Sequence, residues 1–165
     1  MAVALQNILR FIMLILLQVF ILDNIQFMGY LNPMIYVLFI LSLPVRFPKW
    51  AILFLAFIMG LIIDIFSNTA GMHSFALVFA AFLRTPIINI FTSLDEGSNP
   101  TPSFHTFGVS AYVKYVITIV LLHHITLFFI ESFSFLHLTL LIPKIIISSA
   151  VTILLILAFQ SFKAK

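Results

Sequence analysis

The sequence predicts an all-α integral membrane protein: one polytopic domain over residues 1–165 with six transmembrane helices. Hydrophobic residues make up 63% of the chain and charged residues only 8%, with a mean hydropathy of +1.25. Soluble domains carry about a quarter of their residues as charges, so this chain cannot cover its surface for water. Its apolar stretches are also near the length of about twenty residues that a helix needs to cross the bilayer.

Six apolar stretches qualify as spans. They are 4–22, 31–46, 50–66, 72–91, 108–130 and 138–160. The first resembles the hydrophobic part of a signal peptide, but no small-x-small cleavage site precedes Asp23, so we expect a retained helix. The second is the shortest: Pro33 suits a first helical turn, and Pro44 and Pro48 close the stretch.

The distribution of Lys and Arg predicts which side each connection faces, because basic residues stay on the cytoplasmic side. With the N-terminus inside, seven basic residues lie toward the cytoplasm: Arg10, Arg46, Lys49, Arg84, Lys114, Lys163 and Lys165. Only Lys144 lies on the other side, and Asp23, Asp64 and Glu131 mark the three outer connections. We therefore expect both termini and the long polar loop 92–107 to be cytoplasmic.

Asp64 is the first candidate for a functional role, near the outer end of the third stretch with Gly60 one turn before it on the same face. A carboxylate at the helix centre costs roughly 2.5–3.5 kcal/mol to insert, and less near the interface. Two interpretations stay open: an interfacial residue beside water, or a site residue with a partner.

The fourth stretch follows a turn ending in Gly71, and one of its faces is predicted to be interior. That face carries His73, Leu77, Ala80 and Arg84 at spacings of three and four residues. Small residues beside it, such as Ala76, allow close helix approach. Arg84 has a long stem that can extend to the cytoplasmic headgroups, and Pro86 predicts a kink or a helix end.

The fifth stretch offers His123, His124 and Glu131. Seven residues make two turns, so His124 and Glu131 share a face while His123 points elsewhere. A zinc site needs three or four convergent ligands and a proton relay needs a series of ionisable groups, and the sequence indicates neither. We expect the histidines to make interhelical hydrogen bonds, with no catalytic, cofactor or metal site.

Several function classes lose support from what the sequence lacks. There is no Cys, no glycine-rich phosphate loop, no Gly-x-Ser-x-Gly elbow and no His-Glu-x-x-His pattern. Basic residues are dispersed rather than clustered, which argues against nucleic acid as a partner. A pore would need a series of polar residues along the helices, and here they are isolated.

The order of short motifs resembles the rod shape-determining protein MreD family, in the form with a long loop before the fifth helix. The motifs are Leu31-Asn32-Pro33, Gly60-x-x-x-Asp64-x-Phe66, Gly71-Met72-His73, Arg84 with Pro86, His123-His124 and Phe129-x-Glu131-x-Phe133-Ser134-Phe135. The resemblance runs from about residue 5 to 161. It makes Asn32, Gly60, Asp64, Gly71, His73, Arg84, His124 and Glu131 the candidates for structural or partner contacts.

The resemblance implies a non-enzymatic subunit of the bacterial elongation machinery, in the cytoplasmic membrane, that helps to position peptidoglycan synthesis. The implied partners are the single-span protein MreC, the MreB filament, and RodA with its penicillin-binding transpeptidase. The implied fold is similar to the six-helix substrate-binding subunits of energy-coupling-factor vitamin transporters.

Two other functions remain as alternatives. A vitamin-binding transporter subunit would have a closed polar pocket on the outer side. An intramembrane hydrolase would need a nucleophile with a base or a carboxylate pair, and Asp64 and Glu131 form such a pair only if the third and fifth helices adjoin.

Overall fold

The computed structural model describes residues 2–24, 31–93, 97–132 and 138–163, and every regular element in these ranges is helical. The elements are α1 (Ala2–Leu17) continued by the π-helical turn η1 (Gln18–Leu22), the 3-10 turn η2 (Ile35–Val37), α2 (Leu38–Leu41), α3 (Lys49–Ser67), α4 (Met72–Phe91), α5 (Phe104–Phe107), α6 (Val109–Ser132) and α7 (Leu138–Lys163). Five helices in these ranges are long and apolar enough to cross a membrane, namely α1 with η1, α3, α4, α6 and α7.

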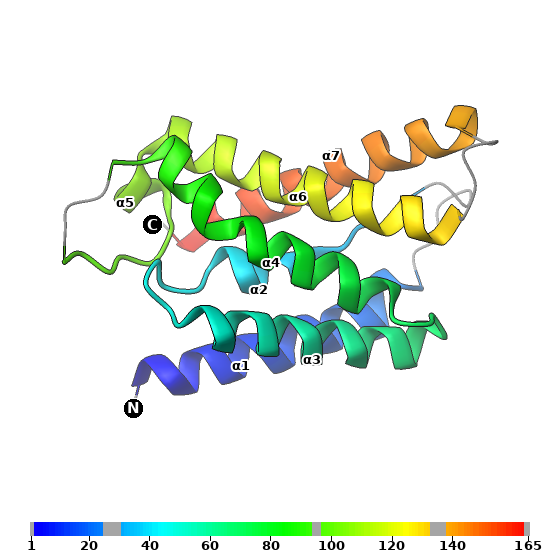
Figure 1. The fold of residues 1–165 in the computed structure, drawn as a ribbon, viewed down its shortest axis with the longest axis horizontal. Helices are drawn as coiled ribbons and strands as arrows, with labels where there is room; N and C mark the ends of the chain where they lie inside the picture. The colour runs from blue at the N-terminus through cyan, green and yellow to red at the C-terminus, as the bar shows by residue number, and fades with distance from the viewer. Residues whose placement is uncertain (1, 25–30, 94–96, 133–137, 164–165) are drawn as a thin grey trace.

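The long helices lie roughly parallel in one bundle (Figure 1). Contacts run in sequence from α3 to α4, from α4 to α6 and from α6 to α7, while α1 packs against α2 and α3. Both chain ends and α5 lie at one end of the bundle, called here the terminal end (Figure 1). The opposite end, where α3 ends at Ser67 and α6 at Ser132, is called the distal end.

The prediction of a transmembrane helix over 31–46 is wrong, because this stretch does not form a long helix. The backbone is irregular from Asn32 to Met34, then forms the two short turns η2 and α2. Residues 33–43 are all buried, and α2 lies in the middle of the bundle (Figure 1). Pro33 does not start a helix, since the first helical turn begins only at Ile35.

This segment nevertheless connects the two ends of the bundle. Asn32 bonds to Ser148 on the distal half of α7, and Val45 donates its N–H to the carbonyl of Pro100 in the loop at the terminal end. Non-helical residues advance about 3.3 Å each against 1.5 Å in a helix, so a short segment covers the distance with few helical turns.

The predicted interior face of α4 is confirmed. His73, Ala76, Leu77, Ala80 and Arg84 are all buried. The helix does not end at Pro86, as one interpretation had it, but continues to Phe91. Membrane helices accept an internal proline because their neighbours and local adjustments satisfy the freed carbonyl.

Candidate functional site

Asp64 lies at the distal end and is 2% exposed, so it is not an interfacial residue facing water. Its carboxylate accepts hydrogen bonds from the backbone N–H groups of His73 (3.0 Å) and Ser74 (2.9 Å) and from the hydroxyls of Thr69 and Ser74 (both 2.6 Å). The first N–H groups of a helix have no intrahelical partner, and their dipoles favour a negative charge. Asp64 of α3 therefore caps α4 from outside, where Gly71 at the N-cap position has no side chain to do so.

Gly60 explains how α3 comes close enough for this cap. A Cβ at this position would lie 2.4 Å from Ser74 Cα and 2.6 Å from Ser74 N. Both are backbone atoms of α4, so no side-chain rotation would make room. Gly60 and Asp64, one turn apart, therefore work together: the glycine permits the contact and the carboxylate holds it.

A buried hydrogen-bonded chain lies next to this cap. The Tyr36 hydroxyl is 2.8 Å from Nδ1 of His73 and 2.9 Å from Nε2 of His123. Tyr36 belongs to the segment 31–46, called here the central segment. His73 belongs to α4 and His123 to α6, so one phenol joins three elements. The two histidines are therefore linked through this hydroxyl.

The positions of the protons in this hydrogen-bonded chain can be assigned from the one ring nitrogen that has no partner. Nδ1 of His123 is buried and has no hydrogen-bond partner among the described residues. A buried N–H without a partner is rarer than a buried free acceptor, so we place the His123 proton on Nε2, where it donates to Tyr36. Tyr36 then donates to Nδ1 of His73, and the proton of neutral His73 lies on Nε2.

The irregular backbone of the central segment is satisfied by side chains from the flanking helices. Gln18 accepts from the N–H of Ile35 (3.0 Å) and donates to the carbonyl of Pro33 (3.1 Å). Thr152 of α7 accepts from the N–H of Met34 (3.0 Å). Non-helical backbone at membrane depth persists only where the protein supplies such partners.

His124 takes part in the same support. Its Nδ1 donates to the carbonyl of Val120 (2.9 Å), and its Nε2 lies 3.2 Å from the hydroxyl of Thr152. This is an interhelical contact between α6 and α7, of the kind expected from sequence. His124 and Glu131, predicted to share a face of α6, lie in different surroundings: His124 is buried and Glu131 is exposed.

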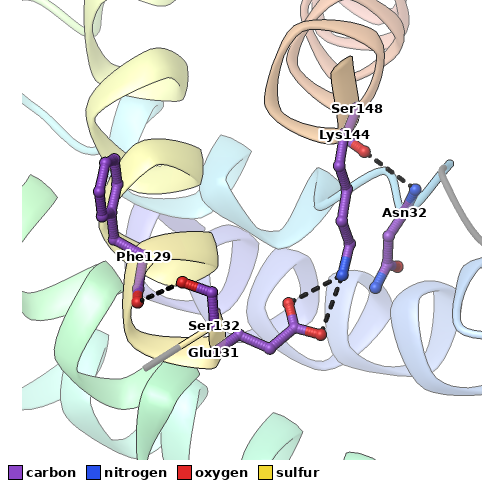
Figure 2. A network of polar contacts seen from close by, with 6 residues as sticks. All are labelled: Asn32, Phe129, Glu131, Ser132, Lys144 and Ser148. Carbon is purple, nitrogen blue, oxygen red and sulfur yellow. Dashed lines mark hydrogen bonds and ion pairs between the residues drawn. The ribbon is translucent and has the colours of Figure 1, made fainter. Parts of the chain in front are cut away.

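Glu131 pairs with Lys144, at 2.9 Å, and not with Asp64. Figure 2 shows this ion pair between α6 and α7, with Asn32 beside it and its backbone N–H bonded to Ser148 (3.1 Å). The ammonium of Lys144 also lies 4.6 Å from the ring centre of Phe128, a cation–π contact. The carboxylate pair that a hydrolase of the proposed type would need is therefore not formed.

A pocket of about 330 Å³ opens at the distal end above these groups. Its polar lining consists of Asp23, Asn24, Asn32, Ser67, Thr69, His73 and Glu131. Two carboxylates, two amides and an imidazole supply both acceptors and donors, a lining suited to a small polar ligand. Among the described residues no group of three or more His, Cys, Asp or Glu side chains is placed to hold a metal ion.

Arg84 lies toward the terminal end, away from this pocket, and is fully buried, so its side chain does not extend to the headgroups as one interpretation proposed. Its guanidinium donates to the carbonyls of Leu43 and Pro44, which follow α2, and its Nε donates to the Tyr115 hydroxyl (3.1 Å). Tyr115 in turn donates to the carbonyl of Leu41 (3.3 Å). Arg84 thus fixes the end of the central segment against α4.

The structure divides the eight predicted residues into groups. Asn32, His73 and Glu131 line the distal pocket; Gly60, Asp64 and Gly71 shape the start of α4; Arg84 and His124 brace the central segment. His123 makes a hydrogen bond between elements, through Tyr36, as expected of the histidines. Gln18 and Tyr36 were not among the predicted residues. Gln18 and Tyr36 are isolated polar residues inside apolar runs, and that position was the available signal.

Comparisons with known proteins add no family to these observations. No protein-family model, no curated protein and no solved structure matches the chain.

Proposed function

We propose that the chain is a non-catalytic scaffold subunit in the bacterial elongation machinery, acting by binding other membrane proteins. The main support for this proposal is the set of hydrogen bonds that the buried polar groups make. Asp64, Arg84 and the Tyr36–His73–His123 chain all bond to backbone or side chains of neighbouring elements. These groups hold helices together, whereas a catalytic site needs a nucleophile, a base and a stabilising donor facing one reacting atom.

The outer surface supports the same proposal. Of the five spanning helices, α1 has the smallest buried share, 22% of its most apolar window. Large side chains along it are exposed, including Leu9 (60%) and Met13 (58%). A transmembrane helix of a partner such as MreC can pack on such a face through shape alone, because helix association in lipid needs no polar motif.

The orientation proposed with this function places the terminal end in the cytoplasm. The central segment is then the sixth crossing, as in the six-span plan of the resembled family. Arg10, Arg46 and Lys114 all lie at or toward the terminal end, in agreement with the rule for basic residues. Reporter fusions at Lys165 and within 95–97 test this orientation, and a reporter on the outer side at either position refutes it.

The partner surface is tested with two matched variants at exposed positions. Leu9→Trp on α1 and Leu154→Trp on α7 replace side chains that are 60% and 66% exposed, so neither should disturb folding. We expect Leu9→Trp to reduce co-purification of MreC in mild detergent, while Leu154→Trp leaves it unchanged. Equal co-purification of MreC with wild type and both variants would rule out α1 as the contact surface. If no elongation protein co-purifies with the wild type, the scaffold proposal is refuted.

A small-molecule-binding subunit is the second candidate, because the distal pocket has the polar lining expected of one. Its test is binding of vitamins to the purified protein, with Glu131→Gln as the pocket variant and Lys114→Gln as a control at the other end. Saturable binding that Glu131→Gln abolishes would favour this candidate over the scaffold.

A further inference from the structure

A second pocket, of about 460 Å³, lies at the terminal end between the connection 45–49 and the end of α4. Arg46 and Lys49 line it on one side, and Thr85, Asn89 and Thr92 line it on the other. None of its described lining residues is acidic. The one ion pair formed among the described residues is Lys144–Glu131 at the distal end, so neither Arg46 nor Lys49 has a carboxylate partner within these ranges.

The wall that carries these cations is held in place by the loop before α5. The N–H of Arg46 donates to the Asn99 side chain (2.7 Å), and the N–H of Val45 donates to the carbonyl of Pro100 (3.1 Å). The backbone that presents Arg46 is therefore fixed by two contacts from a distant part of the chain.

An apolar groove of about 140 Å³ continues from this pocket between α3 and α4. The two share Lys49 and Thr85, and the groove adds the apolar side chains of Leu53, Ala81 and Phe82. Phe82 is exposed on the outside of the bundle, so the groove opens toward the lipid-facing surface. A cationic, hydroxyl-rich pocket thus adjoins an apolar groove on the lipid-facing side of the bundle.

Trp50 indicates the depth of this junction. It follows Lys49 directly and is 74% exposed. Tryptophan is enriched where hydrocarbon meets headgroups, and basic residues at this level attract anionic lipids of the cytoplasmic leaflet.

We propose that the pocket and the groove together form a binding site for one anionic phospholipid. Its phosphate lies between Arg46 and Lys49, its glycerol and headgroup hydroxyls face Thr85 and Asn89, and one acyl chain follows the groove along Leu53. The cations supply charge complementarity, and the groove explains why the occupant is a lipid and not a free anion.

The single tryptophan of the chain provides the test, since Trp50 adjoins the site. The purified protein is placed in phosphatidylcholine nanodiscs that contain increasing fractions of phosphatidylglycerol with brominated acyl chains, which quench tryptophan fluorescence. Brominated phosphatidylcholine serves as the neutral comparison. We expect the anionic lipid to quench Trp50 at a much lower mole fraction than the neutral lipid does.

The variants separate this site from general attraction to the surface. Arg46→Gln with Lys49→Gln should raise the half-quenching fraction of the anionic lipid by at least about tenfold, the scale for losing two basic residues at an anionic surface. Lys114→Gln, on α6 outside the pocket, should leave it unchanged. Unchanged emission maxima before quencher is added confirm that Trp50 keeps its environment in each variant.

Three results would overturn the proposal. They are equal quenching by the two lipids, selectivity that survives in the double variant, and displacement of the anionic lipid by millimolar inorganic phosphate. The last would assign the pocket to a free anion.

Discussion

Replacing Gly60 with Ala should separate α3 from α4. The added methyl carbon would lie 2.4 Å from Ser74 Cα, whereas carbon atoms in contact are about 3.5 Å apart, so the helices must part by about 1 Å. The bonds from the Asp64 carboxylate to the start of α4 are 2.6–3.0 Å long and would stretch by a similar amount.

The expected loss combines three effects. Forcing an extra methyl group into a packed contact costs about 1–3 kcal/mol. Weakening hydrogen bonds to a charged group adds about 1.5–3 kcal/mol. Alanine forms helix more readily than glycine, which offsets about 1 kcal/mol, so we expect a net loss of about 1.5–5 kcal/mol.

Thermal unfolding in mild detergent, followed by circular dichroism, measures this loss. Leu61→Ala, at the neighbouring exposed position of α3, is the control and should change little. The clash involves backbone atoms, so Ser74→Gly cannot rescue Gly60→Ala, although it would relieve a clash with the Ser74 hydroxyl. A Gly60→Ala protein as stable as wild type, or full rescue by Ser74→Gly, would refute the reasoning.

Two further predictions concern the buried polar contacts. Arg84→Lys should lower the free energy of unfolding by about 1–3 kcal/mol, because an ammonium cannot reproduce the guanidinium fork to Leu43 and Tyr115; a stability equal to wild type in the same unfolding assay would contradict this. Tyr36→Phe removes the hydroxyl between His73 and His123 and should cost about 1 kcal/mol, the scale of polar contacts in membrane bundles, with helix content unchanged. Ring-proton shifts of both histidines should change together by NMR, and a change at only one would disprove the shared contact.

Most of the helical framework could be predicted from the sequence. The predicted stretch 72–91 matches α4 from Met72 to Phe91, and the prediction 50–66 differs from α3 by one residue at each end. Lipid enforces this agreement, because a spanning segment must be long, apolar and hydrogen-bonded within itself. The interior face of α4 was predictable for a related reason, since small and polar residues at helical spacing prefer the interior of a bundle.

The central segment could not be predicted in the same way. Residues 31–46 are as apolar as a spanning helix. However, the backbone N–H groups of Ile35 and Met34 donate to side chains that lie 17 and 118 residues away, those of Gln18 and Thr152. Periodicity reports only local hydrogen bonding. It cannot show that a distant side chain will take the place of an intrahelical carbonyl.

The sequence alone therefore determined that this protein lies in a membrane and where its long helices are, because composition and the length of apolar stretches govern transfer into lipid. Only the tertiary structure decided what the isolated polar residues do. Asp64 caps a neighbouring helix instead of facing water, and Arg84 binds backbone carbonyls instead of extending to the headgroups. In both cases the nearest suitable partner, not the residue's depth in its own helix, set the role, because burying a charged group costs least where hydrogen bonds compensate it.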